Sequence, residues 1–270
     1  MSTLKLWSNR IKHLFYLRLT SKQFLTAYSA KYDLRFRFSI KDGVGKDIYC
    51  KFGVYSEDYI TDYLLKEIGV KDEDFIIDIG ANIGWYSLTL SSAAAPTIFS
   101  FEPDALNFSL LHQNAELNNK TNIRLFNVAV SNENGTKTLF LYKDHNLGRH
   151  SLIQHQKSKK SIEVTTVKLD DVLVTEEMNT QRIKLMKLDI EGFEYMALLG
   201  ATEALKRCDN LLLEFSPDLM KKIGQEPMDC IRLIQNTGFK IQRIDPSGLA
   251  EPDFEQIIRN NEQVNFFCRK

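Results

Sequence analysis

The chain has 270 residues, of which 43% are hydrophobic and 26% charged, a balance typical of a globular protein with a sizeable core. Basic and acidic residues number 35 each, so the formal net charge is zero and no overall field favours a nucleic-acid partner. No apolar run approaches the length of a membrane span. The cysteines are widely spaced and predict reduced thiols in a cytoplasmic protein, rather than a zinc site or a disulfide framework: Cys50, Cys208, Cys230 and Cys268.

The N-terminal segment mixes basic and bulky apolar side chains and lacks the features of a signal peptide. Residues 1–20 have two interpretations: a basic amphipathic helix in peripheral contact with a membrane, or a cap helix packed on the domain or on a second subunit. We expect helix from residue 1 to about residue 30. This segment begins a cap over residues 1–70, which we do not treat as an independent domain, and a main domain follows over residues 71–270.

The rest of this cap is predicted from hydrophobic periodicity. Apolar and polar residues alternate over 32–40, which predicts a half-buried strand. Residues 47–52 are expected to return as the second strand of a hairpin after a glycine turn. Residues 55–68 place apolar side chains at helical spacing and predict a helix that leads into the main domain.

The main domain opens on a strand, a glycine turn and a helix. Residues 75–79 form an apolar run with Asp78 near its end, which predicts a buried parallel strand. Gly80 and Gly84 bound a tight turn, and a helix is expected to follow up to about residue 94. The pattern D-x-G-x-N-x-G differs from G-x-G-x-x-G and lacks a phosphate-binding lysine, which counts against dinucleotide and P-loop sites. A ligand with an amine and a carboxylate would use Asp78 and the turn amides.

Strands and helices then alternate to the C-terminus. The alternation predicts an α/β fold with a mostly parallel seven-stranded sheet and helices on both faces, in which the last two strands close antiparallel. Further strands are expected at 97–101, 123–130, 137–142, 161–169, 183–190, 210–215, 239–244 and 264–268, with helices from 104, after 191 to about 200, and over 228–236.

Polar residues gather at the carboxyl ends of these strands, where such sheets bind ligands. Glu102 follows the second strand at about the spacing at which an acid accepts hydrogen bonds from a ribose diol. Asn127 and Val128 would flank a nucleobase or pack in the core, and both readings stay open. Asp189 and Glu191 follow the fourth strand.

These motifs together resemble one family. The set DIGANIGWYSL, FEPD, NVAVS and KLDIEGFE, with TTVKLDDVL before the last, is similar to the FkbM family of S-adenosylmethionine (SAM)-dependent methyltransferases from about residue 55 to the C-terminus. The resemblance implies a Rossmann-like class I methyltransferase fold and methyl transfer to a hydroxyl of a sugar, glycan or polyketide-type natural product. It also implies contacts with SAM for Asp78, Gly80, Asn82, Gly84 and Glu102.

Methyl transfer to oxygen requires a base, because a sugar hydroxyl is a weak acid. The candidates are Asp189, which shares a strand face with Lys187, then Glu191, Glu214 and His150 of a polar loop. Asp189 and Glu214 could instead hold Mg²⁺, which prefers oxygen ligands; this reading is not favoured because the sequence shows two ligands.

Other functions are weighed against this one. An NAD-dependent oxidoreductase would have a similar fold, but its glycine fingerprint is absent from this sequence. A non-catalytic SAM-fold binding module would not need the acids at the strand ends. A nucleic-acid methyltransferase is disfavoured by the zero net charge. The expected partner is therefore a small-molecule or glycan acceptor, and the sequence does not reveal the oligomeric state.

Overall fold

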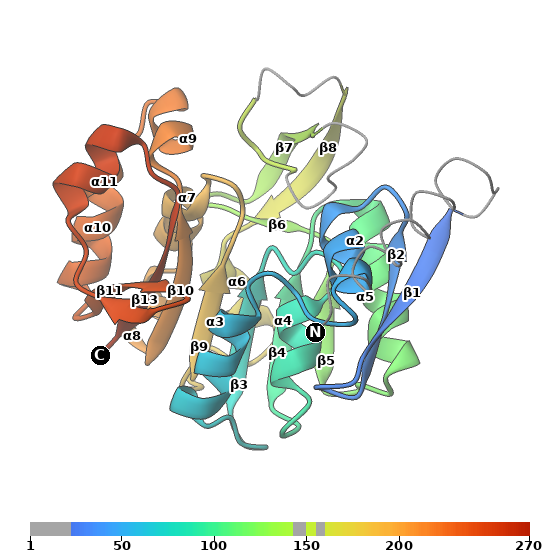
Figure 1. The fold of residues 1–270 in the computed structure, drawn as a ribbon. Helices are drawn as coiled ribbons and strands as arrows, with labels where there is room; N and C mark the ends of the chain where they lie inside the picture. The colour runs from blue at the N-terminus through green and yellow to red at the C-terminus, as the bar shows by residue number, and fades with distance from the viewer. Residues whose placement is uncertain (1–22, 143–149, 155–159) are drawn as a thin grey trace.

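The computed structural model describes residues 23–270 except 143–149 and 155–159. A twisted eight-stranded sheet runs through the centre of the molecule (Figure 1). In spatial order its strands are β12 (Gly248–Ala250), β11 (Lys240–Asp245), β13 (Val264–Arg269), β10 (Asn210–Phe215), β9 (Leu185–Leu188), β3 (Phe75–Ile79), β4 (Thr97–Phe101) and β5 (Ile123–Phe126).

The strand order fixes where a ligand can bind. β3 pairs in parallel with β4 on one side and with β9 on the other, and β5 and β10 extend the parallel part outward. The order therefore reverses between β3 and β9, the point at which open α/β sheets bind ligands. The predicted mostly parallel sheet and its antiparallel closing pair, β11 and β13, are confirmed; β12 adds a short eighth strand on β11.

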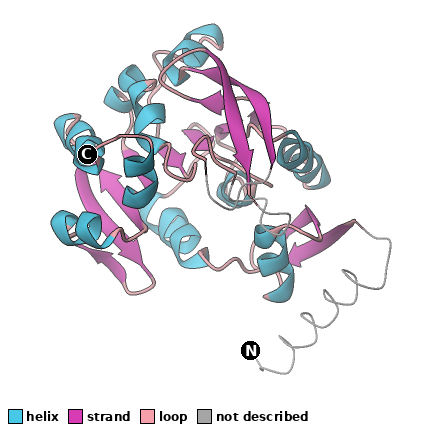
Figure 2. Cartoon of the chain, turned by 90° about the horizontal axis from the view of Figure 1, so that it is seen from above, coloured by secondary structure: helices cyan, strands magenta, loops and turns pink. Residues whose placement is uncertain are grey.

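Helices cover both faces of the sheet (Figure 2). The α-helices are α2 (Gly43–Cys50), α3 (Asp58–Tyr63), α4 (Trp85–Leu90), α5 (Ala105–Leu117), α6 (Leu169–Thr175), α7 (Glu194–Leu199), α8 (Thr202–Lys206), α9 (Pro217–Lys222), α10 (Pro227–Asn236) and α11 (Phe254–Asn260); a π-helical turn, η1 (Leu64–Ile68), continues α3.

Successive side chains of β3 enter different hydrophobic clusters, as the period of a strand requires. Ile77 packs with the buried faces of α6, α7, α8, α10 and α11, whereas Ile76 packs with α3, η1, α4 and the N-terminal layer. The second cluster contains Phe36, Leu64 and Trp85, so it joins the N-terminal layer directly to the sheet.

The hairpin of the N-terminal layer differs from the prediction. β1 (Phe24–Ser29) pairs antiparallel with β2 (Leu34–Ser39), so the predicted helix does not extend over β1 and the predicted partner strand at 47–52 is wrong. Residues 43–50 form α2 instead, because Asp42 Oδ2 accepts a hydrogen bond from the Gly45 amide at 2.6 Å and caps the helix. The helix predicted over 55–68 is confirmed as α3 and η1. Residues 1–20 lie outside the described part.

The predicted strand over 123–130 divides in two. After β5 the chain leaves the central sheet, and β6 (Ala129–Val130) joins a three-stranded sheet with β8 (Lys160–Val167) and β7 (Gly135–Leu141). Asn127 lies at the break, where its side-chain amide donates to the carbonyls of Glu102 and Pro103. This small sheet, seen at the top of Figure 1, lies beside the carboxyl ends of β4 and β9.

Within the described residues, no helix combines the length and the apolar character needed to cross a bilayer.

Candidate active site

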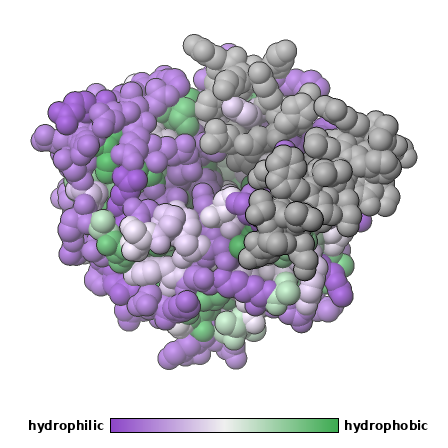
Figure 3. Space-filling view, viewed as in Figure 1, coloured by the Kyte–Doolittle hydropathy of each residue, from purple (hydrophilic) through white to green (hydrophobic). Residues whose placement is uncertain are grey.

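A pocket lies at the carboxyl ends of β3, β4, β9 and β10. Its empty space is about 1160 Å³, open mouth included. Among the described residues, the face seen in Figure 3 is mostly polar. Eight of the residues singled out from the sequence line the pocket: Gly80, Asn82, Glu102, Val128, His150, Asp189, Glu191 and Glu214.

The other three do not line it. Asp78 is 1% exposed and lies beneath the glycine turn, where its Oδ2 accepts from Ser87 Oγ at 2.5 Å. A side chain at Gly84 would lie 2.7 Å from Leu111, so this glycine allows the turn to pack on α5. Asn127 secures the end of β4. The structure therefore gives Asp78, Gly84 and Asn127 supporting positions behind the pocket wall.

The glycine turn requires its unusual backbone. Gly80 has φ +79°, and a Cβ there would lie 2.0 Å from the Asp189 carbonyl oxygen. Asn82 has φ +51°, in the left-handed region that asparagine tolerates better than most residues. The turn thus brings β3 and β9 into direct contact at the switch point.

The turn amides are used within the protein. The N–H groups of Gly80 and Ala81 both donate to the Phe101 carbonyl at 3.0 Å, and that of Asn82 donates to Glu102 Oε2 at 2.8 Å. The sequence predicted that these amides would face a ligand. Because their hydrogen bonds are made internally, side chains must provide most of the polar recognition in this pocket.

Glu102 is the polar centre of one end of the pocket. It is 5% exposed, and its two oxygens accept hydrogen bonds from the amides of Asp104 and Asn82 at 2.9 and 2.8 Å. Burial raises the pKa of Glu102 to about 8 even though these amides act in the opposite direction. Asp104 in turn caps α5 through the amides of Leu106 and Asn107, where the sequence predicted that a helix begins.

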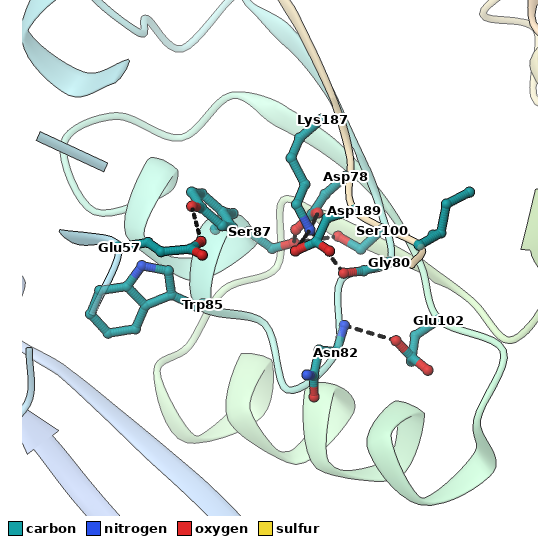
Figure 4. Close-up of polar contacts among 12 residues, drawn as sticks. Glu57, Asp78, Gly80, Asn82, Trp85, Ser87, Ser100, Glu102, Lys187 and Asp189 are labelled. Carbon is teal, nitrogen blue, oxygen red and sulfur yellow. Dashed lines mark hydrogen bonds and ion pairs between the residues drawn. The ribbon is translucent and has the colours of Figure 1, made fainter. Parts of the chain in front are cut away.

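Lys187 forms a buried network below the pocket floor (Figure 4). Its Nζ donates to the Gly80 carbonyl at 2.9 Å and lies 3.5 Å from both Asp78 Oδ1 and Asp189 Oδ2. Burial acts to lower the pKa of Lys187, but the carboxylates of Asp189 and Asp78 outweigh it and hold that pKa above its ordinary value. The ammonium therefore remains charged and gives Asp189 a counter-charge.

Glu57 enters the pocket from the N-terminal layer, and sequence reasoning missed it. Its Oε2 accepts a hydrogen bond from the Tyr86 hydroxyl at 3.2 Å. Burial, reinforced by the charge of Asp189, raises the pKa of Glu57 to about 7. Glu57 ends no strand and belongs to no motif, so only tertiary packing reveals its position.

Two further acids, Glu214 and Glu191, also line the pocket. Burial first, then the charges of Asp189 and Glu191, raises the pKa of Glu214, whose Oε2 is buried with no hydrogen-bond partner in the described residues. Glu191 has φ +54°, and its carbonyl accepts from Ser151 Oγ at 2.8 Å. Ser151 thus holds the turn that carries Glu191, whose backbone is in the strained left-handed region.

His150 is placed in the pocket but is poorly suited to accept a proton. Its Nδ1 accepts a hydrogen bond from the Tyr142 amide at 3.1 Å, so the neutral ring carries its proton on Nε2. Burial lowers the pKa of His150, which favours this neutral form. The ring therefore offers a hydrogen-bond donor through Nε2.

Asp189 and Glu214, the two acids considered as metal ligands, both line the pocket. In the part of the chain that the structure describes, no group of three or more histidine, cysteine, aspartate or glutamate side chains could hold a metal ion.

The chemistry of the pocket fits a nucleoside carrying an amino acid. At one end, Glu102 can accept hydrogen bonds from hydroxyl groups beside Asn82, whose Oδ1 is buried without a hydrogen-bond partner among the described residues. At the other end, the acids Glu57, Asp189 and Glu214 match a cation. SAM combines both kinds of group.

Comparison with known proteins agrees with this chemistry. A protein-family model described as the methyltransferase FkbM domain matches residues 78–241. Methyltransferase 1 of Beauveria bassiana is 28% identical over 162 residues, covering 53% of this chain and 65% of that protein. The 31-O-demethyl-FK506 methyltransferase FkbM of Streptomyces tacrolimicus is 28% identical over 171 residues, covering 53% and 65%.

A third relative is the hexuronic acid methyltransferase AglP of Haloferax volcanii, 26% identical over 171 residues, covering 63% of this chain and 64% of that protein. The matches thus span just under two thirds of the length of these three relatives. The family model covers more than half of this chain. The methyltransferase fold and the SAM cofactor expected from the sequence are those of this family. The resemblance found in the sequence is confirmed: the chain belongs to the FkbM methyltransferase domain family.

Proposed function

We propose that this protein is a SAM-dependent O-methyltransferase that acts on a hydroxyl group of a sugar, a glycan or a polyketide-type small molecule. Two relatives support the acceptor class by their names: one is a 31-O-demethyl-FK506 methyltransferase and the other a hexuronic acid methyltransferase. The pocket supports it by placing several carboxyl groups beside one opening, where an acceptor hydroxyl would lose its proton.

The residues that would hold SAM divide between the two ends of the pocket. Glu102 would accept hydrogen bonds from the ribose hydroxyls, with Asn82 and Val128 beside the nucleoside and Gly80 at the turn. Asp78, Gly84 and Asn127 would act indirectly by keeping this wall in place. When bound, SAM supplies a methyl group activated by a sulfonium.

One observation carries the assignment of the base. Asp189 lies at the carboxyl end of β9 with its side chain 35% exposed in the pocket, while Lys187 supports it from below. We propose that the Asp189 carboxylate accepts the proton of the acceptor hydroxyl. The proton leaves as the hydroxyl oxygen bonds to the methyl carbon and the carbon–sulfur bond of SAM breaks. Glu191 and the Nε2–H of His150 would orient the acceptor.

The experiment is a transfer assay with isotopically labelled SAM and a panel of neutral sugars, uronic acids and macrolide alcohols, with and without Mg²⁺. We expect a methyl ether on a hydroxyl-bearing acceptor, and Asp189→Asn to lower the turnover number by about 10²- to 10⁴-fold while SAM still binds. Glu73→Gln, an exposed carboxyl removed in the same way, should leave turnover unchanged.

Each alternative gives a different result. SAM binding without transfer to any acceptor would indicate a non-catalytic module. Turnover that requires Mg²⁺ and is lost equally in Asp189→Asn and Glu214→Gln would assign those acids to a metal. Methylation of nitrogen rather than oxygen, or full turnover in Asp189→Asn, would contradict the proposed role of Asp189.

A further inference from the structure

The amino-acid end of SAM must find its hydrogen-bond partners in this pocket, and the glycine turn offers few. The carbonyls of Gly80, Ala81 and Ile83 already accept from Lys187 Nζ, the Gly84 amide and Asn114 Nδ2 respectively. The turn amides of Gly80, Ala81, Asn82 and Gly84 are also paired within the protein. A charged ammonium group would gain more from a side-chain carboxylate, which offers an opposite charge that these carbonyls lack.

Three carboxyl groups lie at the acidic end, and they are not equivalent. Asp189 already faces the ammonium of Lys187 at 3.5 Å. The Oε2 atom of Glu214 is buried away from solvent. Glu57 has one oxygen bonded to the Tyr86 hydroxyl, and no described residue donates a hydrogen bond to its other oxygen. Glu57 thus has an acceptor left for a ligand and, unlike Asp189, no ion-pair partner among the described residues.

The position of Glu57 agrees with this role. Figure 4 shows Glu57 and Glu102 on opposite sides of Asp189 and Gly80. If Glu102 accepts from the ribose, the amino-acid end of the same ligand extends toward the side of Glu57. Glu57 also lies before residue 78, where the match of the family model begins, and it belongs to the N-terminal layer, at the N-cap of α3.

We propose that Glu57 binds the ammonium group of the amino-acid end of SAM, an assignment that rests on the function proposed above. Tyr86 orients the carboxyl by donating to Oε2, and Oε1 accepts from the ammonium. The arrival of a cation also stabilises the ionised form of Glu57, which burial and the nearby charge of Asp189 otherwise disfavour. The N-terminal layer thereby completes the cofactor site.

The test is direct binding by titration calorimetry of three ligands: SAM, S-adenosylhomocysteine, and 5′-methylthioadenosine, which lacks the amino-acid end. In Glu57→Gln, which keeps an acceptor for Tyr86, we expect the Kd of both SAM and S-adenosylhomocysteine to rise about tenfold to hundredfold, as for a lost charge-assisted hydrogen bond. Methylthioadenosine should bind Glu57→Gln as it binds the unaltered protein. This third ligand also shows that the variant is folded and its nucleoside end intact.

The matched control is Glu67→Gln, which removes an exposed carboxyl from the same N-terminal layer and should change none of the three affinities. Unchanged affinity of Glu57→Gln for SAM and S-adenosylhomocysteine would overturn the assignment. Weaker binding of SAM alone would also overturn it, because it would place Glu57 at the sulfonium instead. Failure of the unaltered protein to bind SAM would refute the proposed function itself, which is a distinct result.

Discussion

At the scale of single residues, the pocket depends on charges that are buried and paired. Lys187 joins three groups from different parts of the chain: the Gly80 carbonyl, Asp78 and Asp189. Alternation along the fourth strand correctly predicts that Lys187 and Asp189 share a face. Asp78 joins them because β3 and β9 are adjacent, with Asp78 opposite Lys187 in register. Lys187 is therefore expected to determine both folding and the position of the base.

Replacement of Lys187 tests this network. In Lys187→Met the carboxylate of Asp78, 1% exposed, loses its counter-charge, and we expect a loss of about 3–5 kcal/mol in the free energy of unfolding measured with urea. Adding Asp78→Asn should restore part of that loss. Adding Asp189→Asn should restore less, because Asp189 is 35% exposed. Equal rescue by the two substitutions would contradict the picture of Asp78 as the buried partner.

Glu102 makes the affinity for SAM depend on pH. Its pKa of about 8 in the folded protein, against an ordinary value of 4.5, means that folding disfavours its ionised form. Its contribution to stability therefore falls as pH rises from about 4.5 to 8. Because the carboxylate is the form that accepts from both ribose hydroxyls, the affinity for SAM should rise by up to about tenfold per pH unit until pH passes the pKa.

Calorimetric titration with SAM between pH 6 and 9, in about half-unit steps, measures this dependence. Glu102→Gln should bind more weakly and lose the part of the rise near pH 8, whereas the part near pH 7, where Glu57 titrates, should remain. The same rise in Glu102→Gln as in the unaltered protein would show that another group causes it.

At the scale of secondary-structure elements, Asn114 of α5 connects the N-terminal hairpin to the glycine turn, and the C-cap residue Asn118 also binds the hairpin. Asn114 accepts from the Arg37 amide at 2.6 Å and donates to the carbonyls of Arg37 and Ile83. Asn118, one helical turn later, makes the equivalent pair of hydrogen bonds with Arg35. Together they pair the free edge of β2 as another strand would.

Alanine substitutions of Asn114 and Asn118 form a matched pair of variants. Asn114→Ala leaves buried peptide groups of the hairpin and the turn without partners, and should cost about 1–3 kcal/mol of stability and weaken SAM binding. Asn118→Ala releases the hairpin edge without touching the turn, and should leave the Kd for SAM unchanged. Equal effects of the two substitutions on Kd would show that the Ile83 carbonyl contact has no part in shaping the pocket.

Local patterns were sufficient to predict several elements of the main domain, but not the helices α6, α8, α9 and α11. The apolar run of β3, the glycine turn and the start of α5 after Asp104 are each determined by residues close together in sequence, and the structure has them where they were expected. The hairpin partner was not predicted, because alternation identifies a strand but not the strand it pairs with. The division of 123–130 into β5 and β6 depends on pairing with β8, which lies far along the chain.

The residues of the candidate site were likewise predicted only in part. Strand ends correctly indicated Glu102, Asp189 and Glu214 as pocket residues, because parallel strands bring their carboxyl ends to one edge of the sheet. The internal use of the turn amides and the entry of Glu57 follow from tertiary contacts that have no local signal.

At the scale of the whole molecule, the N-terminal layer and the sheet share one hydrophobic cluster, so the pocket is assembled from both. The main domain contributes Glu102 and Asp189 to the pocket, and the N-terminal layer contributes Glu57. The central claim is that this combined pocket binds SAM as the donor of a methyl group. Every role assigned above to an individual side chain depends on that claim.

The most direct test is calorimetric titration of the purified full chain with SAM and, separately, with NAD. We expect binding of SAM with a Kd in the micromolar range, about −8 kcal/mol, and no detectable heat with NAD. Binding of NAD without SAM, or of neither ligand, would contradict the account.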